Sequence, residues 1–461
     1  MGEFITLREN TRNLQSWDES LFFLENNNGK WKTYVRFDNI ILREVENMEK
    51  QFGVQKEILK LRTRKEYLAL RKLSHLSKNM YNVGLYSVRQ HFFETKKYLR
   101  YKENYHVCKS NENYKLMGSA AAQQTLKKVE ENFKSFFGLL KAEGQKARIP
   151  RYLDKEAHFE LSYPQFKLQK DGTFNLPVSP AFKREYGTIN VHFPSNLDSS
   201  EIAEIRILPK YNAHYFEIEY VYKKQVEQQK LNKEEALSLD LGIDNFVAGI
   251  DTLGHSFLVS GKRVKSLNQW YNKENKRLQS IKDKQKISHL TNRQVCLLRK
   301  RNNVLRDFLN KTTRYVIKHC LDNGIGKLVV GLNKGWKQSI NIGKKNNQKF
   351  VQIPHSQFIR KLERISQRYG IELIVQEESY TSKASFLDND KLPVYHKNSK
   401  ENPIFSGKRA FRGLYKTSMS ILVNADLNGA ANILRKCNHT SEFSDKVARG
   451  LLAVPMRVKL V

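Results

Sequence analysis

"ALSLDLGIDNFVAGIDTLGHSFLVSG", residues Ala236 to Gly261, is the stretch of sequence that decides the fold. It holds three apolar runs of strand length, separated by short turns that carry Gly or Asp, and this pattern predicts three strands joined by hairpin turns. Asp240 lies inside the first run, where a charge is costly unless it has a partner or binds a metal. The stretch therefore predicts a sheet that carries a carboxylate with a function.

The strands and helices expected after this stretch complete the order of elements of a known fold. Long basic helices are expected from Lys265 to about Asn323, and after them come a strand "KLVVGL", a helix from about Val351 to Tyr369, a strand "IELIVQEE", a polar insertion and a helix "NADLNGAANILRK". The order βββαβαβα is that of an RNase H-like fold, in which helices flank a mixed sheet.

The chain before this region divides by the period of its apolar residues. From about 57 to 145 they recur every three or four positions, which predicts a helical module with basic and aromatic residues on its polar faces. From about 150 to 227 the period drops to two, which predicts a small antiparallel β domain. The polar segment "VEQQKLNKEE" after it is typical of a linker.

The charge balance points to nucleic acid as the partner. The chain has 461 residues with 81 Lys and Arg against 47 Asp and Glu, a formal charge of +34, and the charge is spread along the chain among 21 Tyr and 25 Phe. A polyanion would neutralise this charge and aromatic rings would stack on bases. A membrane surface would instead call for a local basic cluster or an amphipathic anchor.

Several other classes of protein are disfavoured. No signal peptide and no apolar run of about 18 residues is found, so we expect a cytoplasmic protein with no membrane contact. The four cysteines form no C-x-x-C pair, which argues against a disulfide framework and a zinc knuckle.

Carboxylates at separate elements indicate a metal site. Asp426 begins the last predicted helix, where it could cap the helix, but hydrolysis of a phosphodiester by two divalent ions needs carboxylates from separate elements, and Asp240 and Asp426 would converge in this fold. A third carboxylate is expected at the end of the fourth strand, where the chain has Gly331. Glu377 and Glu378 end the neighbouring fifth strand, and either could lean across the space that the glycine leaves.

The motifs of the chain resemble those of the TnpB family, the transposon-encoded RNA-guided nucleases related to the type V CRISPR effectors and to Fanzor. The resemblance covers most of the chain and rests on a long ordered set: "LSKNMYNVGLYSVRQ", "NYKLM", "SFFGLLK", "RIPRY", "DLGIDN", "VVGLNKGWKQ", "KFVQIPHSQF", "EESYTSKASFLD", "SGKRAFRGLYKT" and "NADLNGAANILRK".

The resemblance implies a multidomain α+β protein. A helical recognition domain would be inserted in a small β-barrel (wedge) domain, and an RNase H-like (RuvC) α/β nuclease domain would follow. The expected divisions are an N-terminal segment with the first part of the wedge domain (1–56), the recognition domain (57–147), the second part of the wedge domain (148–227), a linker (228–236), the first part of the RuvC-like domain (237–378), an insertion at the zinc-finger position (379–420), the last RuvC helix (421–436) and a C-terminal tail (437–461).

The resemblance also implies the site. Asp240 and Asp426 would be the first and last RuvC aspartates, and Gly331 stands where most members have a glutamate. Some members have that glutamate displaced to the segment before "YTS", which favours Glu378, with Glu377 as the alternative. Two Mg²⁺ ions would be bound by Asp240, Glu378 and Asp426. The insertion lacks the cysteine pairs of many relatives, so we expect no zinc.

Nucleic-acid contacts are expected around this site. The residues are Lys334, Lys337, Tyr380, Thr381, Ser382, Lys408, Arg409, Arg412 and Lys416. The alternatives are a turn-stabilising role for Thr381 and Ser382, and a solvated charged loop for the basic cluster that starts at Lys408. Asp244 and Asp251 are on hairpin turns, where acidic residues are common, and the 12 histidines form no H-x-x-x-H pair.

These observations predict an RNA-guided, metal-dependent DNA endonuclease of transposon origin, a hydrolase linked to DNA recombination. It would be a monomer that binds a guide RNA made from the transposon end and cuts double-stranded target DNA beside a short adjacent motif, associating with the nucleoid when bound to DNA. Two alternatives stay open. The chain could be a nuclease-inactive, RNA-guided DNA-binding repressor, or an accessory transposition protein without a guide.

Overall fold

The structure is a computed structural model. It describes residues 51–142, 147–224, 229–332, 353–394, 403–437, 450 and 452–460, and the backbone of three short strands before them. The chain forms two compact units, Met1–Phe52 and Gly53–Val461. In the first unit, β1 (Ser20–Glu25), β2 (Trp31–Arg36) and β3 (Arg43–Glu44) pair as an antiparallel sheet.

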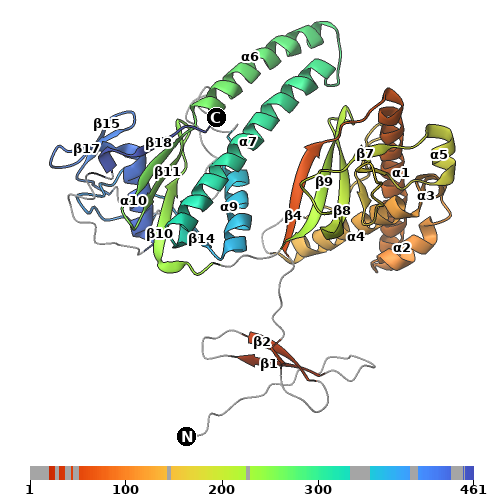
Figure 1. The fold of residues 1–461 in the computed structure, drawn as a ribbon, viewed down its shortest axis with the longest axis horizontal. Helices are drawn as coiled ribbons and strands as arrows, with labels where there is room; N and C mark the ends of the chain where they lie inside the picture. The colour runs from red at the N-terminus through yellow and green to blue at the C-terminus, as the bar shows by residue number, and fades with distance from the viewer. Residues whose placement is uncertain are drawn as a thin grey trace. The chain divides into compact units, whose positions relative to one another are not determined.

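The second unit begins with helices inserted between the strands of one sheet. The elements are β4 (Gln51–Ile58), α1 (Arg64–Thr95), α2 (Tyr101–Cys108), α3 (Glu112–Met117), α4 (Ser119–Lys141), β5 (Leu161–Tyr163), β6 (Thr173–Asn175), α5 (Pro180–Tyr186), β7 (Asn190–His192), β8 (Ile202–Lys210) and β9 (Tyr215–Lys224) (Figure 1). The sheet order β4-β9-β8-β5 places the strands before and after the helices side by side. The described strands from β4 to β9 form this open sheet and a β6–β7 pair.

Local sequence explains where the long helix α1 begins. The side chain of Thr63 accepts a hydrogen bond from the backbone N–H of Glu66, and the Glu66 side chain accepts one from the backbone N–H of Thr63. This reciprocal capping box satisfies two otherwise free backbone donors at the helix start. Behind it, buried residues such as Leu73 and Met80 share one core with Ile207 of the sheet.

The rest of the second unit is built on a six-stranded sheet. Its elements are β10 (Asn232–Asp240), β11 (Asn245–Asp251), β12 (Ser256–Ser260), α6 (Lys262–Lys284), α7 (Asn292–Asp322), β13 (Ile325–Gly331), α9 (His355–Tyr369), β14 (Glu372–Gln376), β15 (Lys408–Phe411), β16 (Leu414–Lys416), β17 (Leu422–Asn424), α10 (Ala425–Lys436) and β18 (Met456–Val458). The strand order is β14-β13-β10-β11-β12-β18, with β10, β13 and β14 parallel and β11 antiparallel to its neighbours.

The order of strands and helices agrees with the sequence prediction, but three segments differ from it. Strand β10 begins at Asn232, inside the expected linker, because it continues the parallel pairing with β13. In the expected C-terminal tail, β18 pairs with β12 and covers the edge of the sheet. In the insertion, β15 and β16 form a hairpin, and β17, at the start of the expected last-helix segment, completes a small antiparallel sheet with them.

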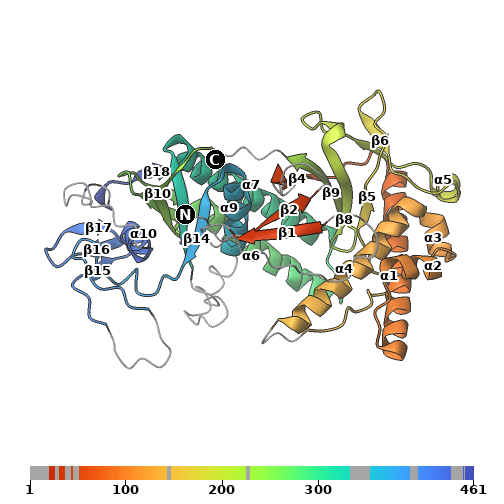
Figure 2. The same cartoon turned by 90° about the horizontal axis from the view of Figure 1, so that it is seen from below.

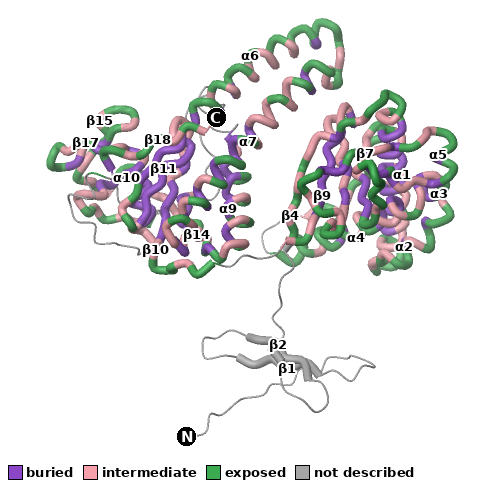
Figure 3. The backbone as a smooth tube through the Cα atoms, in the orientation of Figure 1, coloured by how far each residue is buried: buried purple, intermediate pink, exposed green. Residues whose placement is uncertain are grey.

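Alternation along β10 assigns its side chains to the two faces of the sheet. Helices α7 and α9 cover one face and α10 covers the other in both views (Figures 1 and 2). Leu237 and Leu239 lie in the core under α7 and α9, whereas the hydroxyl of Ser238 donates to the carbonyl oxygen of Ala430 in α10 at 2.7 Å. Because successive strand residues face opposite ways, Asp240 faces α10. Figure 3 shows these central strands as buried. Among the described residues, no helix has the length and apolarity to cross a membrane.

Candidate active site

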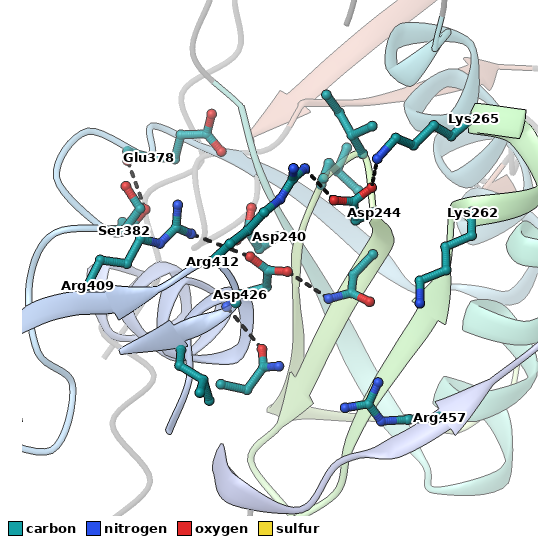
Figure 4. A pocket seen from close by; sticks show the side chains of 18 of the residues that line it. Asp240, Asp244, Lys262, Lys265, Glu378, Ser382, Arg409, Arg412, Asp426 and Arg457 are labelled. Carbon is teal, nitrogen blue, oxygen red and sulfur yellow. Dashed lines mark hydrogen bonds and ion pairs between the residues drawn. The ribbon is translucent and has the colours of Figure 1, made fainter. Parts of the chain in front are cut away.

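Three acidic side chains from separate elements line one open cavity of about 1030 Å³ (Figure 4). Asp240 ends β10, Glu378 lies two residues after β14, and Asp426 lies in the first turn of α10. The structure therefore brings together the three residues that the sequence suggested as metal ligands.

The carboxylates repel one another. Burial, followed by the charges of Glu378 and Asp426, raises the pKa of Asp240 to about 8, although Arg409 acts in the opposite direction. A carboxylate in such surroundings is costly to ionise unless positive charge comes close. The cavity therefore favours a bound cation.

Two glycines leave the room that these carboxylates occupy. A Cβ atom added to Gly331 would lie 2.9 Å from Oε2 of Glu378 and would overlap Ile433 of α10. A Cβ atom added to Gly429 would lie 2.7 Å from Oδ2 of Asp240. The space beside Gly331 is thus shared by the Ile433 side chain and the carboxylate of Glu378, which follows the neighbouring strand β14.

The neighbouring Glu377 is bound elsewhere. Its Oε2 accepts from Nζ of Lys436 at 2.6 Å and its Oε1 accepts from the backbone N–H of Ser379 at 2.7 Å. The Lys436 side chain is only 6% exposed and also donates to the carbonyl oxygens of Ser379 and Pro393. Burial would raise the pKa of Glu377, but these contacts hold it below its usual value. Glu377 does not line the cavity, whereas Glu378 does.

Asp426 does not cap its helix. The side chain of Asn424 accepts from the backbone N–H groups of Asp426 and Leu427 at 3.0 and 3.1 Å and provides the cap. The Asp426 carboxylate instead accepts from Nδ2 of Asn245 at 2.7 Å and lies 3.6 Å from Nη2 of Arg409. Sequence reasoning missed Asn245, because its partner is 181 positions away.

Basic side chains surround the carboxylates. Arg409 and Arg412 from the β15–β16 hairpin line the cavity, and Arg412 forms an ion pair with Asp244, which also accepts from Nζ of Lys265 at 2.5 Å. The sequence indicated only a hairpin turn at Asp244, which in the structure lies on the wall of the cavity. Lys262 and, from β18, Arg457 also line it.

Two other members of the predicted basic set, Lys408 and Lys416, face each other in register on β15 and β16 and are absent from the cavity lining. Lys334 and Lys337 lie outside the described residues.

The segment Tyr380 to Ser382 also lines the cavity. Thr381 is 4% exposed; its hydroxyl donates to the carbonyl oxygen of Glu378 at 2.9 Å, and its own carbonyl oxygen accepts from Nδ2 of Asn432. These contacts fix the turn that carries Glu378, so the turn-stabilising alternative holds for Thr381. Tyr380 and Ser382 remain available on the cavity wall.

Comparisons with known proteins agree with this architecture. Residues 219–337 match the OrfB_IS605 family, described as "Probable transposase", and residues 355–433 match the TNB domain of Cas12f1-like proteins. The TnpB-like protein ORF457 of Acidianus two-tailed virus is 24% identical over 408 residues, which cover 80% of this chain and 83% of the relative.

A solved structure extends the likeness to the fold. A Cas12f1–sgRNA–target DNA complex matches with a TM-score of 0.50 and 14% identity, over 80% of this chain and 83% of the matched chain. This likeness indicates a mixed α/β multidomain fold of the same kind.

Proposed function

We propose that this TnpB-like chain is an RNA-guided DNA endonuclease of transposon origin. It would cut target DNA beside a short adjacent motif by two-metal-ion phosphodiester hydrolysis. The observation that carries this proposal is the convergence of Asp240, Glu378 and Asp426 on one basic-rimmed cavity.

The residues of the cavity fit Mg²⁺. Carboxylate oxygens are the ligands that this ion prefers, and a divalent cation would offset the repulsion that raises the pKa of Asp240. Asp240, Glu378 and Asp426 would hold two ions, which supply a nucleophilic water at neutral pH and stabilise the leaving oxygen. Glu378 would then serve in place of the glutamate that most TnpB members have at the position of Gly331.

The remaining side chains would position these ligands and the substrate. Asn245 orients the Asp426 carboxylate, and Lys436 holds Glu377 away from the cavity so that Glu378 faces into it. Arg409 and Arg412 are exposed at the rim, where their guanidinium groups would bind phosphates of the DNA strand.

The fold supports the finer domain assignment. The order β12-β11-β10-β13-β14 with helices on both faces is what we expect of a RuvC-like domain, and in our proposal the helices between β4 and β5 would be a recognition domain inserted in a wedge domain. Tyr415 of the insertion and Val423 just after it are buried in the core that α10 shares with the sheet, and the Tyr415 hydroxyl donates to the carbonyl oxygen of Lys383 at 2.7 Å. This packing is our proposed substitute for the zinc of relatives.

The nucleic-acid partners follow from charge and from the relatives. A net charge of +34 suits a protein that carries a guide RNA and reads the RNA–DNA heteroduplex by its shape and backbone. We propose that the chain acts as a monomer on double-stranded DNA in a prokaryotic cytoplasm.

The test is cleavage by the purified complex of protein and co-purifying RNA on DNA that matches the RNA and carries randomised flanks. We expect Mg²⁺-dependent cutting that is lost in Glu378→Gln and kept in the matched control Glu372→Gln, a change at an exposed glutamate of β14. RNA-dependent DNA binding without cutting in any divalent metal would favour the nuclease-inactive repressor. Absence of a discrete RNA would favour the accessory protein.

A further inference from the structure

Asp251, a buried acidic residue of the same six-stranded sheet, is contacted by two histidine side chains. Oδ2 of Asp251, the last residue of β11, lies 2.9 Å from Nδ1 of His255 and 2.8 Å from Nε2 of His319. His255 follows the β11–β12 turn and His319 lies in the last turn of α7. The three ligand atoms all lie within 4.8 Å of one another.

This cluster is separate from the cavity of the candidate active site. Asp251 pairs with Leu237 near the middle of β10, whereas Asp240 pairs with Ala248 at its end. Three residues of a strand span about 10 Å. Cross-strand partners share a face, so Asp251 faces α7 with Leu237, while Asp240 faces α10. The two aspartates thus serve opposite faces of the sheet.

The donor set suits a transition-metal ion. Two imidazole nitrogens and one carboxylate oxygen are ligands that Zn²⁺ takes in proteins, usually with water or a further ligand in the fourth position. The His255 side chain is 51% exposed, so an ion and a water can reach the cluster from solvent, whereas Asp251 is fully buried.

The carboxylate is also oriented as metal ligands usually are. Oδ1 of Asp251 accepts from the backbone N–H groups of Leu253 and His255 at 3.1 and 2.8 Å, which leaves Oδ2 to face the two rings. Hydrogen bonds of this kind to the non-ligating atom fix a ligand's direction and are typical of metal sites. The same oxygen would satisfy two imidazole N–H groups in a simple hydrogen-bonded cluster, which is the competing arrangement.

We propose that Asp251, His255 and His319 bind one Zn²⁺ ion. The ion would tie the β11–β12 hairpin to the C-terminal end of α7 and so stabilise the scaffold of the nuclease sheet. This departs from the expectation that the chain binds no zinc, which rested on the lack of cysteine pairs and concerned the insertion. Binding would require neutral imidazoles and an ionised carboxylate.

The test uses the full chain, stripped with a chelator, in an Asp240→Ala background so that the cavity carboxylates contribute less. Zn²⁺ is titrated in competition with a chromophoric zinc indicator, and thermal unfolding is followed with and without ZnCl₂. We expect one tightly bound Zn²⁺ per chain and a rise in Tm. His255→Asn should weaken binding by at least about tenfold and abolish the rise in Tm. The control His289→Asn, at an exposed histidine, should change neither.

The choice of His255 keeps the test decisive, because its side chain is half-exposed; the Tm of the metal-free variant measures separately what the loss of its hydrogen bond to Asp251 costs. His319→Gln should behave as His255→Asn does. If the chain binds no Zn²⁺ with sub-micromolar affinity, or if both variants bind it as tightly as the unsubstituted cluster, the proposal is wrong and the three residues form a hydrogen-bonded cluster only.

Discussion

Asp240 and Asp251 lie on adjacent antiparallel strands of one sheet, yet their surroundings affect their charges in opposite ways. Burial and the charges of Glu378 and Asp426 together raise the pKa of Asp240 to about 8. Burial would also raise the pKa of Asp251, but hydrogen bonds from His319 and from the backbone and ring of His255 hold it below its usual value.

The difference separates two uses of a buried carboxylate. Asp251 finds its partners within the chain, so its charge contributes to a stable structure. Asp240 faces other carboxylates, so its charge is a cost to the fold that Arg409 offsets only in part and that a bound cation would offset further. Sites that are kept at a cost to stability are commonly functional. Each prediction below tests one side of this contrast.

The largest effect is expected on cleavage. Asp240→Ala should lower the cleavage rate constant of the RNA-loaded protein by at least about a thousandfold, because a metal ligand supplies several kcal/mol of transition-state stabilisation and each ~1.4 kcal/mol is a factor of ten. Asp251→Asn should retain cleavage, measured well below its own unfolding temperature. Equal losses in both variants would mean that the two aspartates do not differ in function as proposed.

Substitutions of the two aspartates should affect the stability of the fold in opposite directions. In the presence of EDTA, Asp251→Asn should lower the free energy of unfolding by about 3 kcal/mol, since it removes the buried charge to which both histidines and two backbone N–H groups bond. Asp240→Asn should instead raise the stability of the metal-free protein at neutral pH, because it removes a carboxyl group that burial and the charges of Glu378 and Asp426 make costly to ionise. Thermal unfolding of the two variants beside the parent measures both signs; a destabilised Asp240→Asn would contradict the account.

The stability gained in Asp240→Asn should depend on pH, because the pKa of Asp240 is raised in the folded protein. The folded protein holds the Asp240 proton up to about pH 8, whereas the unfolded chain loses it near the ordinary value of 3.8. The parent protein therefore loses stability as pH rises from about 4 to about 8, and the Tm advantage of Asp240→Asn should widen over that range and then level off. Added Mg²⁺ should reduce the advantage. An advantage that is the same from about pH 5 to about pH 8 would show that Asp240 does not titrate there.

The contrast also shows how far the sequence alone could predict the site. Asp240 was identifiable because a charge inside an apolar strand demands an explanation, and Glu378 because Gly331 leaves space beside it. Asp251 looked like an ordinary hairpin residue, since its partner His319 lies 68 positions away and only the packing of α7 on the sheet brings them together. No local pattern carries a contact of that separation.

The fold likewise could be predicted where the local sequence pattern is clear, and not where an element depends on long-range contacts. The predicted order of strands and helices is seen because each has a clear apolar period and turn residues at its ends. Strand β18 was missed because three residues are too few to show a period, and its position depends on the free edge of β12.

Gly331→Ala tests the packing around the cavity carboxylates by adding a single methyl group. In Gly331→Ala the added methyl group would overlap Ile433 and approach Oε2 of Glu378, so we expect a loss of about 1–3 kcal/mol in stability. Displacing Glu378 should also raise the Mg²⁺ concentration needed for half-maximal cleavage. The matched control is Gly138→Ala, since nothing lies within 4 Å of its added Cβ and alanine favours the helix. If Gly331→Ala cleaves with an unchanged Mg²⁺ requirement, Glu378 does not use the space beside this glycine to reach the metals, and its proposed role as the displaced ligand fails.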